Sequence, residues 1–159
     1  SFSQLKAIQK NGPHQVLRFD DGVNLNTGKF CKLLFKLEKL GCHEAIDEIY
    51  LDNPSILMLP ERIGKFSNLR VISLANNALK QLPNSILRLK LLEMLLVSNN
   101  QITKIPAVFD GLDALHLVDI RENKIQTVDE SVSSVGAIFC FENQMKSGDE
   151  LVGNLVNFG

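Results

Sequence analysis

Residues 69–91 read LRVISLANNALKQLPNSILRLKL, and their apolar positions follow neither a helical nor a strand period. Counted from Leu69, apolar side chains fall at offsets 3, 5, 10, 13, 17 and 20, and Asn77 falls at offset 8. The next 23 residues, LEMLLVSNNQITKIPAVFDGLDA, keep the same phase, with Asn100 at offset 8. Segments that begin at Ile46 and Leu115 follow it too. The chain therefore repeats itself every 23 residues.

This periodicity predicts a solenoid, because repeats of roughly 20–29 residues stack their apolar faces on one another. The pattern resembles the leucine-rich-repeat family, in its plain intracellular 23-residue form with LPxxI motifs such as LPERI and LPNSI. The resemblance covers about residues 46–145. It implies an α/β fold: a curved leucine-rich-repeat solenoid with a parallel sheet on the concave face and an irregular or 3₁₀ convex side.

Each part of the repeat has a physical role. Ile72, Ser73 and Leu74 alternate in and out, which is the period of a strand. A proline after Leu82 removes a backbone donor and fixes φ, which favours a one-turn return path over a second sheet. The resemblance further implies a structural ladder of asparagine amides that join adjacent repeats: Asn77, Asn100, Asn123 and Asn143. Because the last interval is 20 residues rather than 23, the register of AIFCFEN depends on Asn143 alone.

The two ends of the solenoid are expected to carry helical caps, because exposed end repeats would leave apolar surface and unpaired strand groups. Apolar residues at helical spacing predict an amphipathic helix over residues 28–40, which ends before Gly41. We expect a first strand at QVLRF (15–19) and a short helix in SQLKAIQKNG that ends near Gly12. Ser147 and Glu150 fit a capping box and predict a C-terminal helix. The whole chain, 1–159, is expected to be one domain, with cap regions 1–45 and 146–159.

Composition is ordinary for a soluble globular domain, with 45% hydrophobic residues, 22% charged residues and a net charge of −1. Lysines and arginines are spread along the chain, so no basic stripe in the sequence indicates a nucleic acid or an anionic membrane. No apolar run approaches the roughly 18 residues that cross a bilayer. We therefore expect neither nucleic acid nor membrane as a partner.

Function is expected on the outward-facing strand positions, because the leucine positions are used for packing. An apolar row on a face that water reaches typically marks an interaction site. We predict that a protein or peptide binds the concave face, beside a polar rim that includes Glu122 and Glu142. The predicted partner-binding residues are Tyr50, Val71, Met94, Leu96, Leu117, Asp119, Arg121 and Phe139.

A purely structural interpretation of this row stays open. Val71, Met94 and Leu117 would then be partly covered by their neighbours in a small sheet. Phe139 or Phe141 would pack under the C-terminal cap, and for Phe141 this interpretation is preferred.

The sequence shows no catalytic or metal-binding pattern, so we expect no enzyme, no cofactor and no metal. His14, His43 and His116 are widely separated, and no second pair accompanies Cys42 and His43 at a zinc-like spacing. The loop FDDGVNLN (19–26) misses the EF-hand spacing and is better explained as a turn. Cys140 falls on an inward strand position, where cysteine is usually a small core residue.

Two classes of function are compatible with these observations. The first is a free-standing, non-catalytic protein-interaction module or scaffold. The second is a substrate-recognition or targeting domain of a larger signalling enzyme, such as a kinase, GTPase or ubiquitin ligase. An extracellular ligand receptor is a third, less favoured class. Three cysteines cannot pair completely, and extracellular members of the family usually carry cysteine-rich caps, so a cytoplasmic (intracellular) location is expected.

Overall fold

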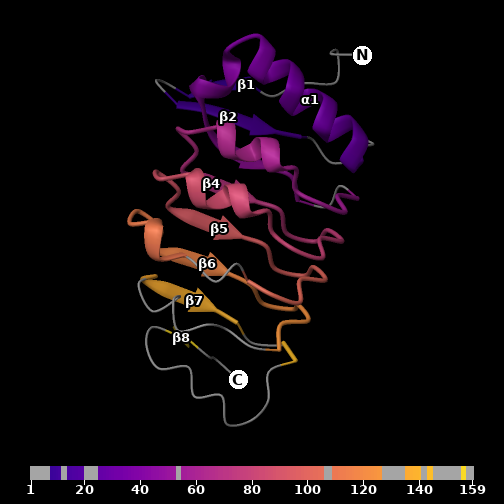
Figure 1. The fold of residues 1–159 in the computed structure, drawn as a ribbon, viewed down its shortest axis with the longest axis vertical. Coiled ribbons are helices and arrows are strands. Elements are labelled where there is room, and N and C mark those ends of the chain that lie inside the picture. Colours follow the sequence, from indigo (N-terminus) through magenta and orange to yellow (C-terminus); the bar gives the residue numbers. More distant parts are fainter. Residues whose placement is uncertain are drawn as a thin grey trace.

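Short strands stack in chain order along one axis of the molecule (Figure 1). The computed structural model describes residues 8–11, 14–19, 25–52, 55–105, 109–126, 135–140, 143–144 and 155–156. One eight-stranded sheet has the order β1 to β8. Its strands are β1 (Ile8–Asn11), β2 (His14–Arg18), β3 (Ile46–Tyr50), β4 (Val71–Ser73), β5 (Met94–Leu96), β6 (Leu117–Asp119), β7 (Ala137–Phe139) and β8 (Leu155–Val156).

The pairing of these strands confirms the parallel sheet. Strands β1 and β2 are antiparallel, and each neighbouring pair from β2 through β8 is parallel. Ile72 pairs with Leu95, and Leu95 pairs with Val118, so the 23-residue period of the sequence is the register of the sheet. Ile138 continues the row after Val118, which bears out the register expected for AIFCFEN.

Short 3₁₀ helices form the other side of the repeats, as the prolines predicted. They are η2 (Cys42–Ala45), η3 (Glu61–Lys65), η4 (Asn84–Arg88) and η5 (Phe109–Gly111). Pro60 and Pro83 immediately precede η3 and η4 with φ of −69° and −74°, the value to which the proline ring restricts the backbone. The two helices approach closely, because a Cβ at Gly64 would lie 2.7 Å from the carbonyl oxygen of Ser85.

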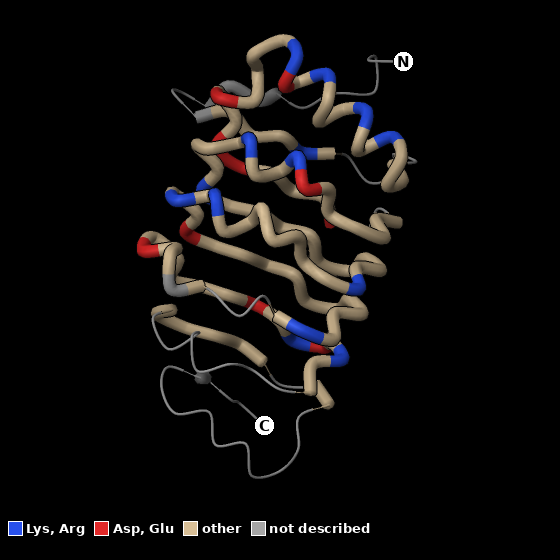
Figure 2. Tube along the Cα trace, viewed as in Figure 1, with Lys and Arg blue, Asp and Glu red and all other residues tan. Residues whose placement is uncertain are grey.

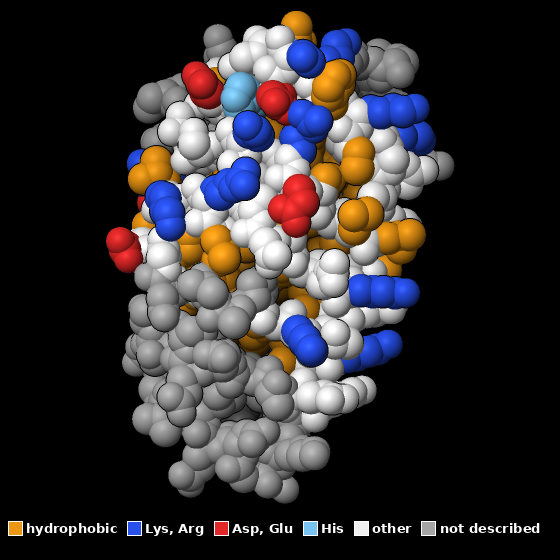
Figure 3. Space-filling model, in the orientation of Figure 1, with side chains coloured by type: hydrophobic (Ala, Val, Ile, Leu, Met, Phe, Trp, Pro, Cys, Tyr) orange, Lys and Arg blue, Asp and Glu red, His pale blue; other side chains and the backbone are white. Residues whose placement is uncertain are grey.

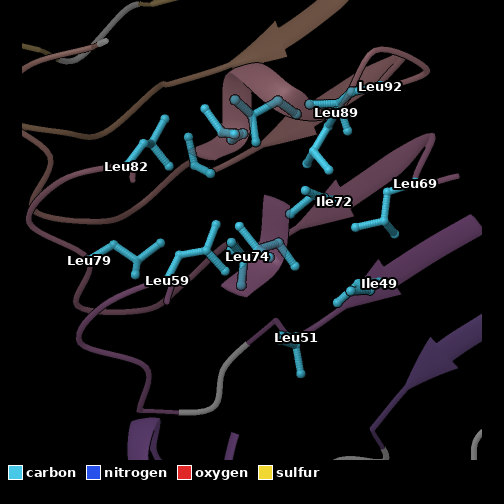
Figure 4. Close-up of a cluster of buried hydrophobic side chains, with 14 of the residues drawn as sticks. Ile49, Leu51, Leu59, Leu69, Ile72, Leu74, Leu79, Leu82, Leu89 and Leu92 are labelled. Carbon is cyan, nitrogen blue, oxygen red and sulfur yellow. The ribbon is translucent and has the colours of Figure 1, made fainter. Parts of the chain in front are cut away.

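One continuous core runs between the sheet and the 3₁₀ helices. Side chains from successive repeats interdigitate there (Figure 4), and Ile72, Leu95 and Val118 are each fully buried. The inward side chains of β7 and of the residue after it, Ile138 and Cys140, are also buried. Burial of apolar area shared by neighbouring repeats is what stabilises a solenoid, since no repeat buries its own face alone.

The helix predicted for residues 28–40 is α1 (Thr27–Lys39). Asn26 caps its first turn, where the Asn26 Oδ1 atom accepts a hydrogen bond from the backbone N–H of Lys29 at 3.0 Å. Gly41 follows the helix with φ of +69°, a conformation that glycine adopts without strain. The buried face is Phe30, Leu33, Leu34 and Leu37. The helix lies at the N-terminal end of the stack (Figure 1), and its function as a cap stays a prediction.

The prediction of a short helix in SQLKAIQKNG is wrong for the part of that segment that the structure describes. Ile8–Asn11 is strand β1, and it pairs with β2, the strand expected at residues 15–19. An isolated helix as short as the one expected in SQLKAIQKNG is only marginally stable in water. Antiparallel pairing instead satisfies the backbone groups at the outer edge of β2.

The prediction of a C-terminal helix is also wrong for the residues of that segment that the structure describes. Leu155 and Val156 form β8, which pairs with Ile138 and Phe139 of β7. Extending the sheet satisfies backbone groups of β7 that a helix would have left to water. The predicted capping box at Ser147 and Glu150 lies outside the described residues, as do Phe141 and Glu142.

Candidate functional site

Side chains of β3 to β7 that point away from the core form the outward sheet face. Strand pairing aligns them in two rows across the sheet. The first row holds Glu48, Val71, Met94, Leu117 and Ala137, and the second holds Tyr50, Ser73, Leu96, Asp119 and Phe139. These are the positions that strand alternation predicted. The structure therefore brings the apolar candidates of β5 and β6 together in the middle of the sheet.

Burial on this face differs from the expectation that water reaches the whole row. Val71 is only 8% exposed, because Glu48 and Met94 flank it on the neighbouring strands. Met94, Leu96 and Leu117 are half-buried. The accessible apolar surface is thus centred on β5 and β6, and Val71 belongs to its covered edge.

Asp119 is buried too, because an arginine two residues later covers it. The Arg121 Nε and Nη2 atoms donate to the two carboxylate oxygens of Asp119 at 2.8 and 2.7 Å. The same guanidinium carbon lies 5.9 Å from the centroid of the Phe139 ring. A bidentate arginine–carboxylate pair is geometrically specific. Arg121 therefore forms a fixed polar border between the β6 and β7 parts of the outward sheet face.

The β3 end of the face is more polar. The guanidinium carbon of Arg18 lies 4.4 Å from the centroid of the Tyr50 ring. Burial raises the pKa of the Tyr50 hydroxyl, and the charge of Glu48 raises it further, whereas Arg18 lowers it. Tyr50 therefore stays neutral at physiological pH and presents a hydroxyl as a hydrogen-bonding group. Asp52, two residues after β3, accepts from the Ser73 hydroxyl at 2.7 Å, a contact between neighbouring repeats that alternation alone did not indicate.

The asparagines at offset 8 make equivalent hydrogen bonds in successive repeats. Asn100 accepts from the backbone N–H of Leu79 at 2.9 Å and donates to the carbonyl of Leu74, also at 2.9 Å. The amide thus joins its own repeat to the one before it. The corresponding backbone donors are Ile56 for Asn77, Ile102 for Asn123 and Ile125 for Asn143.

A position one residue before this ladder has left-handed backbone. Asn76, Asn99 and Glu122 have φ of 56°, 50° and 52°. This conformation costs ordinary residues about 1–2 kcal/mol, whereas asparagine adopts it more readily.

We expect Glu122→Asn to raise the free energy of unfolding by about 0.5–1 kcal/mol, measured by chemical denaturation. Lys124→Asn is the matched control and should change stability by less than about 0.5 kcal/mol. Equal effects of the two substitutions would contradict the strain at Glu122.

Sequence reasoning missed a second surface, the outer side of α1. Lys29, Lys32, Lys36 and Lys39 are all exposed there. Their spacing of 3, 4 and 3 residues is the signal that would have found them, since it places side chains on one side of a helix. The even spread of lysines and arginines along the whole sequence gave no indication of this surface.

The described residues include three free cysteines but no metal-binding cluster. Among the described residues, no group of three His, Cys, Asp or Glu side chains is arranged to hold a metal ion. Cys31, Cys42 and Cys140 are free, and burial raises the pKa of the Cys140 thiol, which disfavours the nucleophilic thiolate. Within the described part of the chain, no helix has the length and apolar character that crossing a bilayer requires.

Comparison with known proteins agrees with this geometry. The family model described as "Leucine rich repeat" matches residues 44–102. Over these residues the chain is similar to leucine-rich repeats. No curated protein matches the chain.

Two solved leucine-rich-repeat structures share the fold. The Leptospira interrogans LRR protein LIC12759 has a TM-score of 0.67 and 23% identity, and the match covers 91% of this chain. The leucine-rich repeat domain of APL1B has a TM-score of 0.64 and 24% identity over 80% of this chain. In both cases the chain spans 36% of the matched structure. At these identities the likeness shows the fold alone.

Proposed function

We propose that this chain is a non-catalytic interaction module that binds a protein or peptide through the outward sheet face. The observation that carries the proposal is the cluster of Met94, Leu96 and Leu117. These side chains are adjacent in the pairing of β5 with β6 and are only half-buried. Met and aromatic residues are enriched at interface centres, and accessible apolar clusters are uncommon on isolated domains.

The borders of this cluster suit a partner with an apolar centre and polar ends. On one side, the ion pair of Asp119 and Arg121 and the ring of Phe139 form the edge. On the other, Tyr50 and Glu48 supply a hydroxyl and a carboxylate. An apolar anchor within a polar rim is the usual anatomy of an interface. The same surface would serve a substrate-recognition or targeting domain of a larger signalling enzyme.

We also propose the plain 23-residue subtype and an intracellular location. The 23-residue register of β4, β5 and β6 supports the subtype. Three free cysteines, one of them buried in the core, support a reducing compartment, where thiols persist. Fractionation of cells that express the full-length protein tests the location, and recovery of that protein from the medium would contradict it.

The binding proposal is tested with a charge placed in the apolar cluster. We expect the double variant Met94→Glu, Leu117→Glu to lose at least about tenfold in partner capture, because burying two carboxylates in an apolar interface is costly. Capture from lysate is quantified by mass spectrometry, with thermal melts to verify folding. The control Lys80→Gln, Lys104→Gln has the same change in net charge at exposed positions. Retained capture by the Glu variant, or equal loss in the control, would refute the proposal.

A further inference from the structure

The exposed side of α1 carries a concentrated positive charge, although the whole chain has a net charge of −1. We define the lysine face as Lys29, Lys32, Lys36 and Lys39, which are exposed on this helix. Figure 2 shows these cations along the helix at the N-terminal end of the stack. The one acid of α1, Glu38, forms an ion pair with Arg62 of η3. On α1 itself, cationic side chains therefore outnumber acidic ones.

Exposed apolar side chains accompany these cations. Phe35 and Leu40 belong to the same helix and its C-terminal end, and they are 47% and 62% exposed. Leu57 and Met58 are 60% and 53% exposed. They lie beside the start of the helix, because the Leu57 N–H donates to the Thr27 hydroxyl at 2.8 Å. Figure 3 shows hydrophobic atoms among lysines and arginines over this end of the molecule.

Two cations lie close to the exposed aromatic ring of α1. The guanidinium carbon of Arg62 lies 4.9 Å from the centroid of the Phe35 ring, and the Lys39 ammonium lies 5.6 Å from it. Both cations thus lie within cation–π distance of the same ring, and Arg62 also pairs with Glu38. A surface that places cations beside an exposed aromatic ring matches the boundary between lipid headgroups and acyl chains, where charge and apolar surface are needed at the same depth.

We propose that the lysine face, with Phe35, Leu40, Leu57 and Met58, docks on an anionic membrane surface. Clusters of four to eight lysines and arginines attract anionic lipids. Because the apolar face of α1 is buried in the core, apolar contact with the membrane comes from the exposed Phe35, Leu40, Leu57 and Met58. The lysine ammonium is a point charge that attracts anionic headgroups without a fixed geometry, whereas bidentate recognition of one phosphate favours arginine. Aliphatic side chains such as Leu57 have no role in binding a nucleic acid backbone but insert between headgroups. Because α1 lies at one end of the stack (Figure 1), a planar surface reaches it unobstructed by the repeats.

Vesicle binding tests this proposal. The probe is sedimentation with vesicles of phosphatidylcholine containing about 30% phosphatidylserine, compared with pure phosphatidylcholine. We expect wild-type protein to bind only the anionic vesicles and to be released as salt rises to about 0.5 M. The double variant Lys32→Gln, Lys39→Gln should lower the partition coefficient of the protein for the anionic vesicles about 25-fold, because each lysine near a charged surface contributes about fivefold.

Two controls separate this proposal from the alternatives. Lys80→Gln, Lys104→Gln, with the same charge change elsewhere on the surface, should bind vesicles within about twofold of wild type. The double variant Met94→Glu, Leu117→Glu should also retain vesicle binding. A failure of the membrane proposal is therefore distinguishable from a failure of the proposed partner binding. Equal binding to neutral vesicles or equal loss in the lysine control would overturn the proposal. So would absence of vesicle binding together with capture of polyglutamate, which would assign the lysine face to an acidic polypeptide.

Discussion

Replacing Leu95 by alanine is expected to lower the free energy of unfolding by about 2–5 kcal/mol. Leu95 is fully buried and pairs in register with Ile72 and Val118, so the substitution leaves a cavity between two repeat interfaces at once. Repeat proteins depend on contacts between neighbouring repeats, and loss at a central position therefore weakens both sides of the stack. Thermal melts of the purified variant provide the measurement, with a decrease in Tm of at least about 4 °C expected.

The matched control for this prediction is Lys104→Ala. Lys104 is exposed, and substitutions at exposed positions away from special features usually change stability by less than about 0.5 kcal/mol. A Leu95→Ala protein as stable as Lys104→Ala would show that the assigned packing register is wrong.

The second large effect is expected from Asn100→Ala, at about 1–3 kcal/mol. The Leu74 carbonyl keeps the Asn77 amide and the Val97 carbonyl keeps the Asn123 amide when Asn100 is truncated. The Leu79 N–H, in contrast, loses the Asn100 Oδ1 atom as its acceptor at a buried position. An unsatisfied buried donor is therefore the principal cost. Chemical denaturation measures the loss, with Lys104→Ala again as the reference.

Asn100→Asp distinguishes the roles of the two ends of the amide. Aspartate keeps an acceptor for Leu79 but places a carboxylate where the Asn100 Nδ2 atom donates to the carbonyls of Leu74, Val97 and Ser98. We therefore expect Asp to be at least as destabilising as Ala at neutral pH. A stability equal to that of wild type for either variant would contradict a structural role of this ladder.

The repeated part of the fold was predictable because one period determines several features together. The 23-residue phase sets which side chains are inward, which strands pair and where the asparagine amides lie. Even the 20-residue last interval kept its register, since Asn143 donates to the carbonyls of Ile120 and Cys140. The ends lacked such redundancy. In β1 and β8, backbone pairing with the neighbouring strand decided the structure, and local helical patterns did not.

The candidate site was predictable to a smaller degree. Alternation identified the outward positions of β3 to β7, but it gave no measure of how far neighbours cover each other. Burial of Val71 depends on side chains of two other strands, and burial of Asp119 depends on the conformation of Arg121. The lysine face required a helix whose outer side stays uncovered in the stack. The lysine spacing was a local signal that those side chains share one side of the helix, but the burial of Val71 and Asp119 and the exposure of that side depend on tertiary packing.

Site-specific photo-crosslinking tests the central claim most directly, namely that the accessible apolar cluster of β5 and β6 is the binding surface. A photoreactive p-benzoylphenylalanine is placed at position 94 or 117, or at the exposed control positions 80 and 104. We predict that positions 94 and 117 crosslink the same partner and that the control positions do not. Crosslinking of that partner at 80 and 104 with none at 94 and 117 would contradict the account.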